Sequence, residues 1–422
     1  MTLVMSARMQ RLLFLGLAGA LAATAGCGGS RSSTSISISS GGGGGGGSSS
    51  SSNVLAITVN TGPDAGPPNN SPSINTAFAS VTVCVPGSTS NCDSINDVLV
   101  DTGSSGLRIL ASALTISLPQ QTGAGGNPVV ECLPFVDGFT WGPVQNADVT
   151  IAGEHAQNLP IQVIGSSKFP SIPGSCSSNG PAENDLKTLG ANGILGVGLF
   201  AQDCGGGCTI SGASNAGFYY TCASSGCSIT TEALASQVQN PVALFAADNN
   251  GVIVELPAVI GTETSVSGSL IFGIGTQSNN GLGSAAVYTL DPSSGNLTTR
   301  FNNTTYQNAA FLDTGSNAIY FLDSTTTGIS ACKDLTFWYC PNSAQNLSAT
   351  NQGANGASGT FDFAVGNADT LVSNATVGVA NGLAGPNPGT FDWGLPFFFG
   401  RKVFTAIEGR NTPGGDGPYV AY

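Results

Sequence analysis

The chain carries the triplet Asp-Thr-Gly twice, and each copy follows a short apolar run. The first copy lies in Val98-Leu99-Val100-Asp101-Thr102-Gly103 and the second in Phe311-Leu312-Asp313-Thr314-Gly315. An apolar run that ends in a glycine-containing turn is typical of a buried strand that delivers its last residue to a loop. Chance would give roughly 0.2 copies of the triplet in such a chain, so two copies indicate a pair of carboxylates, Asp101 and Asp313, at two strand ends.

The residues around the two triplets also match, position by position. When Asp101 is laid on Asp313, further pairs coincide: Leu99 with Phe311, Val100 with Leu312, Ser104 with Ser316, Leu107 with Ile319, and Leu110 with Leu322. The two copies are about 200 positions apart, which is about one domain length. The repeat therefore predicts two related lobes rather than a solenoid of short repeats.

Composition favours an all-β chain and excludes some classes of partner. Only 8% of the residues are charged, and 60 glycines accompany many serines, threonines and asparagines, which indicates many turns and few long amphipathic helices. The net charge is −13 with only 11 Lys and Arg, so we do not expect nucleic acid as a partner. The only histidine, His155, lies in a predicted hairpin turn, which disfavours a Ser-His-Asp hydrolase.

The N-terminus predicts an export signal. Arg8 and Arg11 precede an apolar stretch at 12–23, and Thr24-Ala25-Gly26-Cys27 follows it. This pattern predicts a bacterial lipoprotein-type signal peptide over residues 1–27, with lipidation at Cys27. The apolar stretch is shorter than the roughly 20 residues that a membrane span needs. An ordinary signal peptide, or a membrane-anchoring helix with an incidental cysteine, is the alternative.

Residues 28–74 form a predicted tether. The segment is rich in Gly, Ser and Pro and includes seven consecutive glycines at 41–47, a composition typical of a flexible linker. Placed behind a lipidated Cys27, such a linker would hold a folded domain off a membrane surface. Because Gly28 follows the cysteine, resemblance to bacterial lipoproteins implies an exported protein that is lipid-anchored at the outer membrane or cell envelope.

Cysteine count predicts disulfides. Ten of the 11 cysteines remain once Cys27 is set aside, and an even number in an exported protein indicates disulfide bonds. Spacing favours local pairs, which are Cys84 with Cys92, Cys222 with Cys227, and Cys332 with Cys340. The pairing of Cys132, Cys176, Cys204 and Cys208 stays open. A metal site at Cys204 and Cys208 is disfavoured because no histidine is near, and we expect no metal.

At this point the chain resembles the pepsin-like family of bilobed aspartic proteases. Further segments occur in the family's order. About forty residues after Asp101, where the family has a hairpin flap with a Tyr-Gly pair, the chain has Phe139-Thr140-Trp141-Gly142-Pro143; then come Asn192-Gly193-Ile194-Leu195-Gly196, a short helix at 231–238, strands at 241–245, 252–256 and 269–273, and finally the segment 392–408. The resemblance covers about residues 75–422.

The resemblance implies a fold and a site. The fold would be all-β, with two related β-barrel-like lobes at 75–240 and 241–422 and the active-site cleft between them. Asp101 and Asp313 would be the catalytic dyad. Around them, Thr102 and Thr314 would tie the two loops together, Ser104 and Ser316 would bind the outer carboxylate oxygens, and Gly103 and Gly315 would allow close approach of the backbone.

Two carboxylates within hydrogen-bonding distance share one proton, because both cannot ionise together. The ionised partner would activate a water and the protonated partner would polarise a peptide carbonyl. The resemblance thus implies an exported, membrane-tethered aspartic endopeptidase, a hydrolase that acts as a monomer on peptides or unfolded proteins and needs no cofactor.

Three departures from the family pattern motivate an alternative. Trp141, beside Gly142, stands where the flap has Tyr; it is either a lid or a core aromatic. Arg108 stands where the family has Trp, and it could stack on Trp141. Asp392 occupies an apolar place, where it would raise the pKa values of the dyad or simply cap a turn. The alternative function is a non-catalytic module that binds peptides or cell-envelope material on the same scaffold.

Overall fold

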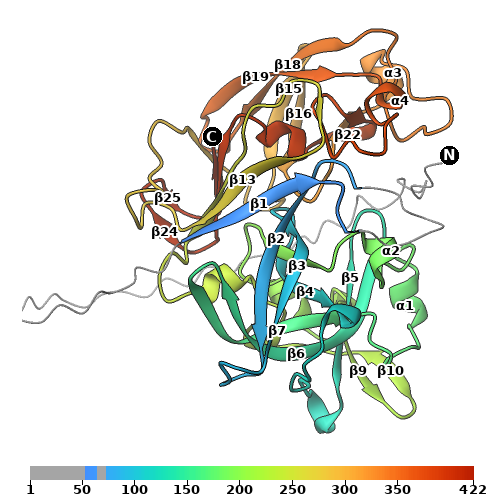
Figure 1. Cartoon of the computed structure of the whole chain (residues 1–422), viewed down its shortest axis with the longest axis vertical. Helices are drawn as coiled ribbons and strands as arrows, with labels where there is room; N and C mark the ends of the chain where they lie inside the picture. Colours follow the sequence, from blue (N-terminus) through green and yellow to red (C-terminus); the bar gives the residue numbers. More distant parts are fainter. Residues whose placement is uncertain (1–52, 64–72) are drawn as a thin grey trace, which may run out of the picture.

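The computed structural model describes residues 53–63 and 73–422. The predicted signal peptide with Cys27, and most of the predicted tether, lie outside these residues. The described part of the chain is an all-β protein with two lobes, which confirms the predicted fold class (Figure 1). Among the described residues, no helix is long and apolar enough to cross a membrane.

Strands from the first half of the chain build the lower lobe of Figure 1. They are β2 (Thr76–Cys84), β3 (Cys92–Asp101), β4 (Ser105–Leu110), β5 (Val129–Pro134), β6 (Phe139–Ile151), β7 (Glu154–Ile164), β8 (Gly193–Val197), β9 (Tyr219–Ala223) and β10 (Gly226–Ile229), with the one-turn helices α1 (Gly174–Ser177) and α2 (Leu186–Leu189).

The second half supplies the remaining elements after a short connection. They are β11 (Gly251–Glu255), β12 (Thr262–Glu263), β13 (Val266–Phe272), β14 (Val287–Thr289), β15 (Leu297–Phe301), β16 (Thr304–Leu312), β17 (Ile319–Leu322), α3 (Ser324–Thr327), β18 (Gln345–Gln352), β19 (Ser358–Val365), α4 (Ala368–Leu371), β20 (Val379–Ala380), β21 (Ala384–Gly385), β22 (Asn387–Trp393), β23 (Lys402–Ala406), β24 (Asn411–Thr412), β25 (Gly415–Asp416) and β26 (Tyr419–Ala421).

A strand that we expected to be tether joins the two lobes. β1 (Val54–Asn60) pairs antiparallel with β2 on one side and with β13 on the other, so a continuous sheet runs from one lobe into the other (Figure 1). The predicted tether at 28–74 is therefore wrong over these residues. The reason is local, because Val54-Leu55-Ala56-Ile57-Thr58-Val59 is a β-branched, apolar run, and Ile57 and Val59 are fully buried.

The sequence repeat is also a structural repeat. In the first half β3 runs parallel to β8, and β4 runs antiparallel to the same strand. In the second half β16 and β17 bear the same relation to β22. Each Asp-Thr-Gly turn thus connects two strands that flank a third. That third strand, β8 in the first half and β22 in the second, sets the position of the turn.

Two predicted elements differ from those observed. The helix expected at 231–238 is only a single 3-10 turn at Leu234–Ser236. The strand expected at 241–245 is a 3-10 helix at Pro241–Leu244. The Asn240 side chain accepts a hydrogen bond from the Val242 N–H at 3.1 Å, and proline occupies the first helical position, so this local start signal outweighs the apolar composition.

Five disulfides lie in the described residues. The three predicted local pairs are confirmed, between Cys84 and Cys92, Cys222 and Cys227, and Cys332 and Cys340. The cysteines whose pairing was open form Cys132 with Cys176 and Cys204 with Cys208. The last bond removes the two thiolates that a metal at Cys204 would have required.

The chain beginning at Asn75 should be much less stable than the chain beginning at Asn53. Loss of β1 removes the buried Ile57 and Val59 and exposes the edges of β2 and β13; burial of each side chain is worth about 1.5–3 kcal/mol. Urea unfolding of the two chains should differ by at least about 3 kcal/mol in free energy of unfolding. Equal midpoints and slopes would show that β1 is dispensable.

Candidate active site

The two Asp-Thr-Gly turns meet between the lobes. Asp101 is the last residue of β3, and Asp313 directly follows β16, where its N–H donates to the carbonyl of Trp393 at 3.1 Å. A β-carbon built on Gly103 would lie 2.5 Å from Asp313 Cγ, and one on Gly315 would lie 2.7 Å from Asp101 Oδ1. Each glycine therefore packs against the opposite carboxyl group, at a distance that no other residue permits.

Reciprocal hydrogen bonds hold the turns together. The Thr102 N–H donates to Thr314 Oγ1 at 3.0 Å, and the Thr314 N–H donates to Thr102 Oγ1 at 3.0 Å. Thr314 Oγ1 also donates to the carbonyl of Val100 at 2.7 Å. Both threonines are buried, so each backbone donor depends on a hydroxyl from the other lobe.

The two carboxyl groups have unequal surroundings. Asp101 Oδ1 accepts the N–H groups of Gly103 at 2.7 Å and Ser104 at 3.2 Å, and the Ser104 hydroxyl donates to Oδ2. Asp313 Oδ1 accepts one N–H, from Gly315 at 2.7 Å, and Oδ2 lies 3.0 Å from Ser316 Oγ. Burial, and next the charge of Asp101, raises the pKa of Asp313 well above its usual value. The larger supply of hydrogen-bond donors favours negative charge on Asp101 rather than on Asp313.

Asp392 is a third buried acid beside the dyad. It lies in β22, with Phe311 and Tyr320 as its neighbours on the flanking strands. Its Oδ2 is 2.6 Å from Ser316 Oγ, whereas its buried Oδ1 has no hydrogen-bond partner. Burial, opposed by the Ser316 hydrogen bond and assisted by the charge of Asp101, raises the pKa of Asp392 to about 8. Burial thus favours the protonated form of Asp392, and because the residue lies within a strand it does not cap a turn.

Arg108 lies in the core of the first lobe and does not stack on Trp141. Its guanidinium pairs with Glu131 at 2.8 Å and with Asp203 at 2.9 Å, and all three side chains are almost fully buried. The Tyr219 hydroxyl donates to the other oxygen of Asp203 at 2.8 Å. No sequence pattern indicated this network, because its members come from strands and loops that only the tertiary fold brings together.

Trp141 is a core residue rather than a lid. It lies within β6, is 2% exposed, packs edge-on against Tyr220 at 5.3 Å and donates from Nε1 to the carbonyl of Phe169 at 2.9 Å. A β-carbon at Gly142 would lie 2.0 Å from the carbonyl oxygen of Val163, so this glycine serves strand packing. Trp141 and Gly142 were predicted to form the flap, but both occupy core positions in the structure.

The turn of the β5–β6 hairpin is at residues 135–138 instead, closed by the Phe135 N–H on the Gly138 carbonyl at 2.8 Å. Asp137 in this turn lies beside Glu183; burial, and next the charge of Asp137, raises the pKa of Glu183 to about 8. Asp137 and Asp392 both act on Tyr320 of β17, where burial is the main cause of a raised pKa. The turn thus faces the second lobe. Asp137 in the turn and Glu183 beside it were missed because the turn was predicted four residues too late.

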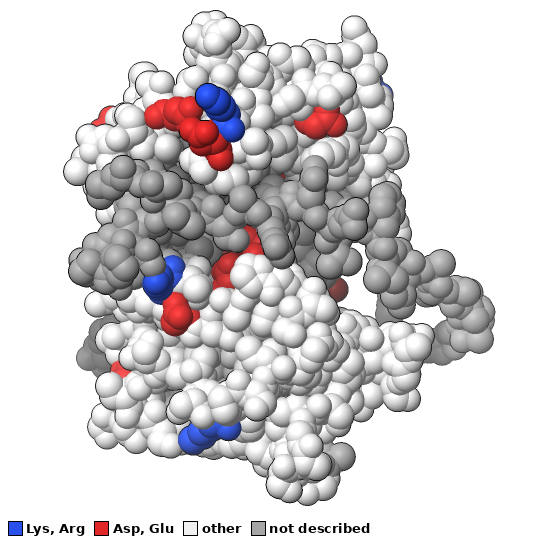
Figure 2. All heavy atoms as spheres, turned by 90° about the vertical axis from the view of Figure 1, so that its right-hand side faces the viewer, with Lys and Arg blue, Asp and Glu red and all other residues white. Residues whose placement is uncertain are grey.

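Charge is sparse elsewhere. On the face shown in Figure 2, most of the surface is uncharged, and acidic side chains lie between the lobes as well as on the lobes themselves.

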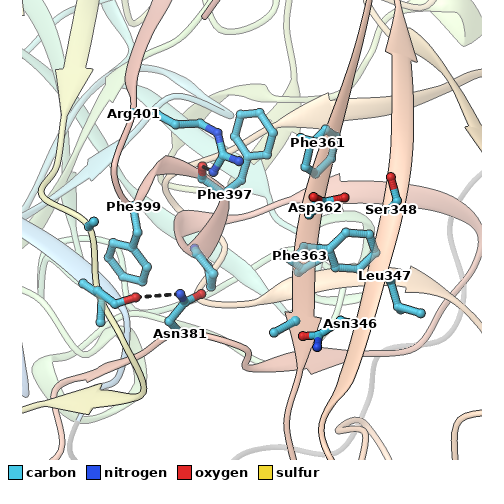
Figure 3. A pocket seen from close by; sticks show the side chains of 15 residues that line it. Asn346, Leu347, Ser348, Phe361, Asp362, Phe363, Asn381, Phe397, Phe399 and Arg401 are labelled. Atoms are coloured by element: carbon cyan, nitrogen blue, oxygen red, sulfur yellow. Dashed lines mark hydrogen bonds between the residues drawn. The ribbon is translucent and has the colours of Figure 1, made fainter.

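A separate cavity of about 660 Å³ lies in the second lobe beside β19, lined by Phe361, Phe363, Phe397 and Phe399 (Figure 3). Arg401 lies over the Phe397 ring at 4.7 Å in that cavity. Neither Asp101, Asp313 nor Asp392 lines it, so it is distinct from the dyad.

Comparison with known proteins supports this description of the fold. A family model described as "Protein of unknown function (DUF3443)" matches residues 49–422. The chain belongs to this family. Among solved structures, the aspartic proteinase from Irpex lacteus is similar, with a TM-score of 0.50 and 16% identity over 87% of this chain and 96% of that chain. This likeness shows a pepsin-like fold for the DUF3443 chain. No curated protein matches it.

The threonine pair should matter for stability as well as for the site. Replacing Thr102 by Val keeps the side-chain shape but leaves the buried Thr314 N–H without its acceptor. We expect a loss of about 1–3 kcal/mol in the free energy of unfolding, measured by urea titration. Thr102→Ser retains the hydroxyl and should lose less than half as much. Equal losses in the two variants would assign the effect to packing.

The folded protein should be most stable in mild acid. The pKa values of Asp392 and Glu183 are raised to about 8 and that of Glu232 to about 7, mainly by burial, while those of Asp313 and Asp203 are also raised. Between about pH 4 and pH 8 the folded chain binds more protons than the unfolded chain, so stability falls as pH rises. We expect Tm to fall by on the order of 5–10 °C from about pH 5 to pH 8 in calorimetry. A Tm that rises over this window would contradict the assignment.

Proposed function

We propose that this protein is an exported, membrane-tethered aspartic endopeptidase. The observation that carries the proposal is that two carboxyl groups, Asp101 and Asp313, interact with each other and are each packed against the glycine of the opposite loop. Two desolvated acids held together destabilise each other, so a chain that needed only the scaffold would gain stability by losing one of them.

The unequal surroundings support a different role for each acid. Asp101, with two N–H donors and one hydroxyl donor, is the ionised partner that takes a proton from the attacking water. Asp313 is the protonated partner that gives its proton to the carbonyl oxygen as the water oxygen bonds to the carbonyl carbon. When the C–N bond breaks, Asp101 passes its proton to the leaving nitrogen, and the hydroxyl proton of the intermediate returns to Asp313. No covalent intermediate forms.

Export and anchoring belong to the same proposal. The signal pattern at 1–27 and the lipidation site at Cys27 support an N-terminal lipid anchor of the bacterial lipoprotein type, facing the cell envelope. Five disulfides suit an oxidising compartment. Since β1 already begins at Val54, the tether would be shorter than the sequence first suggested and would end at the sheet that joins the lobes.

One observation favours a second candidate, a non-catalytic module that binds peptides. The hairpin turn at 135–138 offers no tyrosine hydroxyl or indole N–H, since Trp141 is used in the core. A lid without such a donor could cover a bound peptide without assisting its cleavage. The two candidates differ in whether the bound peptide is cut.

Cleavage of an unfolded protein by residues 53–422 tests the proposal. We expect activity between about pH 3 and pH 7, inhibition by pepstatin, and a loss of at least about a hundredfold in kcat for Asp101→Asn, which removes the base without changing its shape. Asp362→Asn, on the exposed side of β19, is the matched control and should keep full activity. A folded, oxidised sample that binds pepstatin or peptide without cutting would favour the binding module.

A further inference from the structure

Ser316 makes two contacts that one hydroxyl hydrogen cannot serve. Its Oγ lies 3.0 Å from Asp313 Oδ2 and 2.6 Å from Asp392 Oδ2, both within hydrogen-bond distance. A hydroxyl has a single hydrogen to donate, although it can accept two hydrogen bonds. If both contacts are hydrogen bonds, one of the two carboxyl groups must donate its own proton to Ser316 Oγ.

The corresponding position in the first lobe lacks this contact. Register places Ile194 opposite Leu99 on β3 and β8, and it places Asp392 opposite Phe311 on β16 and β22. Leu99 and Phe311 coincide in the repeat, so Ile194 and Asp392 are equivalent positions. The second lobe therefore has a carboxyl group where the first lobe has a buried isoleucine. This difference between the lobes lies beside Asp313.

We propose that Asp392 is a positioning residue for the dyad: it donates to Ser316 Oγ, so that the Ser316 hydroxyl points at Asp313 Oδ2 and confines the Asp313 proton to its inner oxygen. This inference rests on the proposed function. Asp313 Oδ2 then serves as an acceptor and cannot carry the proton. Oδ1 then carries it. A β-carbon on Gly315 would lie 2.7 Å from Asp101 Oδ1 and 3.1 Å from Asp313 Oδ1, so the proton is on the side of Asp101, where a substrate carbonyl would need it.

The environment of Asp392 supports a neutral acid. The acids that act on it or lie beside it are Asp101 and Asp313, and Tyr320 faces it from β17 while donating its own proton to Asn317 Oδ1 at 2.7 Å. The ion pairs found among the described residues do not include Asp392. Its unpartnered Oδ1 costs less as the carbonyl oxygen of a neutral acid than as half of a carboxylate.

Ionisation of Asp392 would reverse the chain of hydrogen bonds. The carboxylate would then accept from Ser316, whose hydrogen would turn away from Asp313. Asp313 Oδ2 could now hold the proton and donate it to Ser316 Oγ. The dyad would keep the same number of protons, but its proton would move to the outer oxygen, away from the substrate. Activity should therefore fall as Asp392 ionises, before the dyad itself is fully deprotonated.

The pH profile of kcat/KM tests this directly. Asp392→Asn keeps a donor to Ser316 at every pH, and Asp392→Ile restores the residue of the other lobe and leaves Ser316 free to donate to Asp313. In either variant the alkaline limb should move up by about one pH unit or more. If Asp392 acted only as a nearby negative charge, its removal would lower the pKa values of the dyad and move the limb down, which would overturn the proposal. Asp362→Asn should leave the limb in place.

A second measurement does not depend on catalysis. In infrared spectra of the folded protein near pH 6, the carbonyl band of the protonated buried carboxyl groups should contain one component that is lost in Asp392→Asn. In Ser316→Ala the band should shift, because the acid loses its acceptor. If Asp392→Asn removes no protonated carboxyl band, or Ser316→Ala leaves the band unchanged, the inference fails. If the bands behave as expected in a protein that cuts nothing, only the proposed function fails.

Discussion

The cross-bonds between Thr102 and Thr314 are the interaction on which the site depends. Each buried backbone N–H finds its acceptor only on the opposite loop, so the lobes cannot separate there without leaving two donors unsatisfied. With the loops fixed, Gly103 and Gly315 let each backbone approach the other carboxyl group. The distance between Asp101 and Asp313 is therefore set by backbone contacts, which are stiffer than side-chain contacts would be.

The packing around the site has to offset the cost of burying its acids. Only 8% of the residues are charged, yet several ionisable side chains are buried, including the Arg108 network and the carboxyl groups of Asp101 and Asp392. The two groups are stabilised differently. Arg108 forms direct ion pairs with Glu131 and Asp203, whereas burial raises the pKa values of Asp313 and Asp392 and so favours their neutral forms. The first solution gives a rigid wall for the lobe, and the second leaves protons available near the lobe interface.

Local patterns and the repeat predicted the fold class, the meeting of Asp101 with Asp313, and the disulfides that close short loops. Features that depend on distant segments were missed. β1 was assigned to the tether because its partners, β2 and β13, are separated by about 190 positions. A stack of Arg108 on Trp141 was considered because its true partners, Glu131 and Asp203, lie 23 and 95 positions away. The hairpin turn was misplaced because the presence of an aromatic residue does not show whether that residue lies in a strand or in a turn.

A duplicated scaffold presents a problem that Asp392 addresses. Two equivalent loops place two equivalent carboxyl groups, but proton transfer needs one acid and one base. The first loop supplies Asp101 with two N–H donors and with the Ser104 hydroxyl, which donates to Asp101. These donors favour the charged form of Asp101. In the second loop the corresponding hydroxyl, that of Ser316, is shared with Asp392, and one backbone donor fewer reaches Asp313. The asymmetry therefore comes from the different numbers of hydrogen-bond donors in the two loops. Asp392, which stands where the first lobe has Ile194, adds a third acid to it.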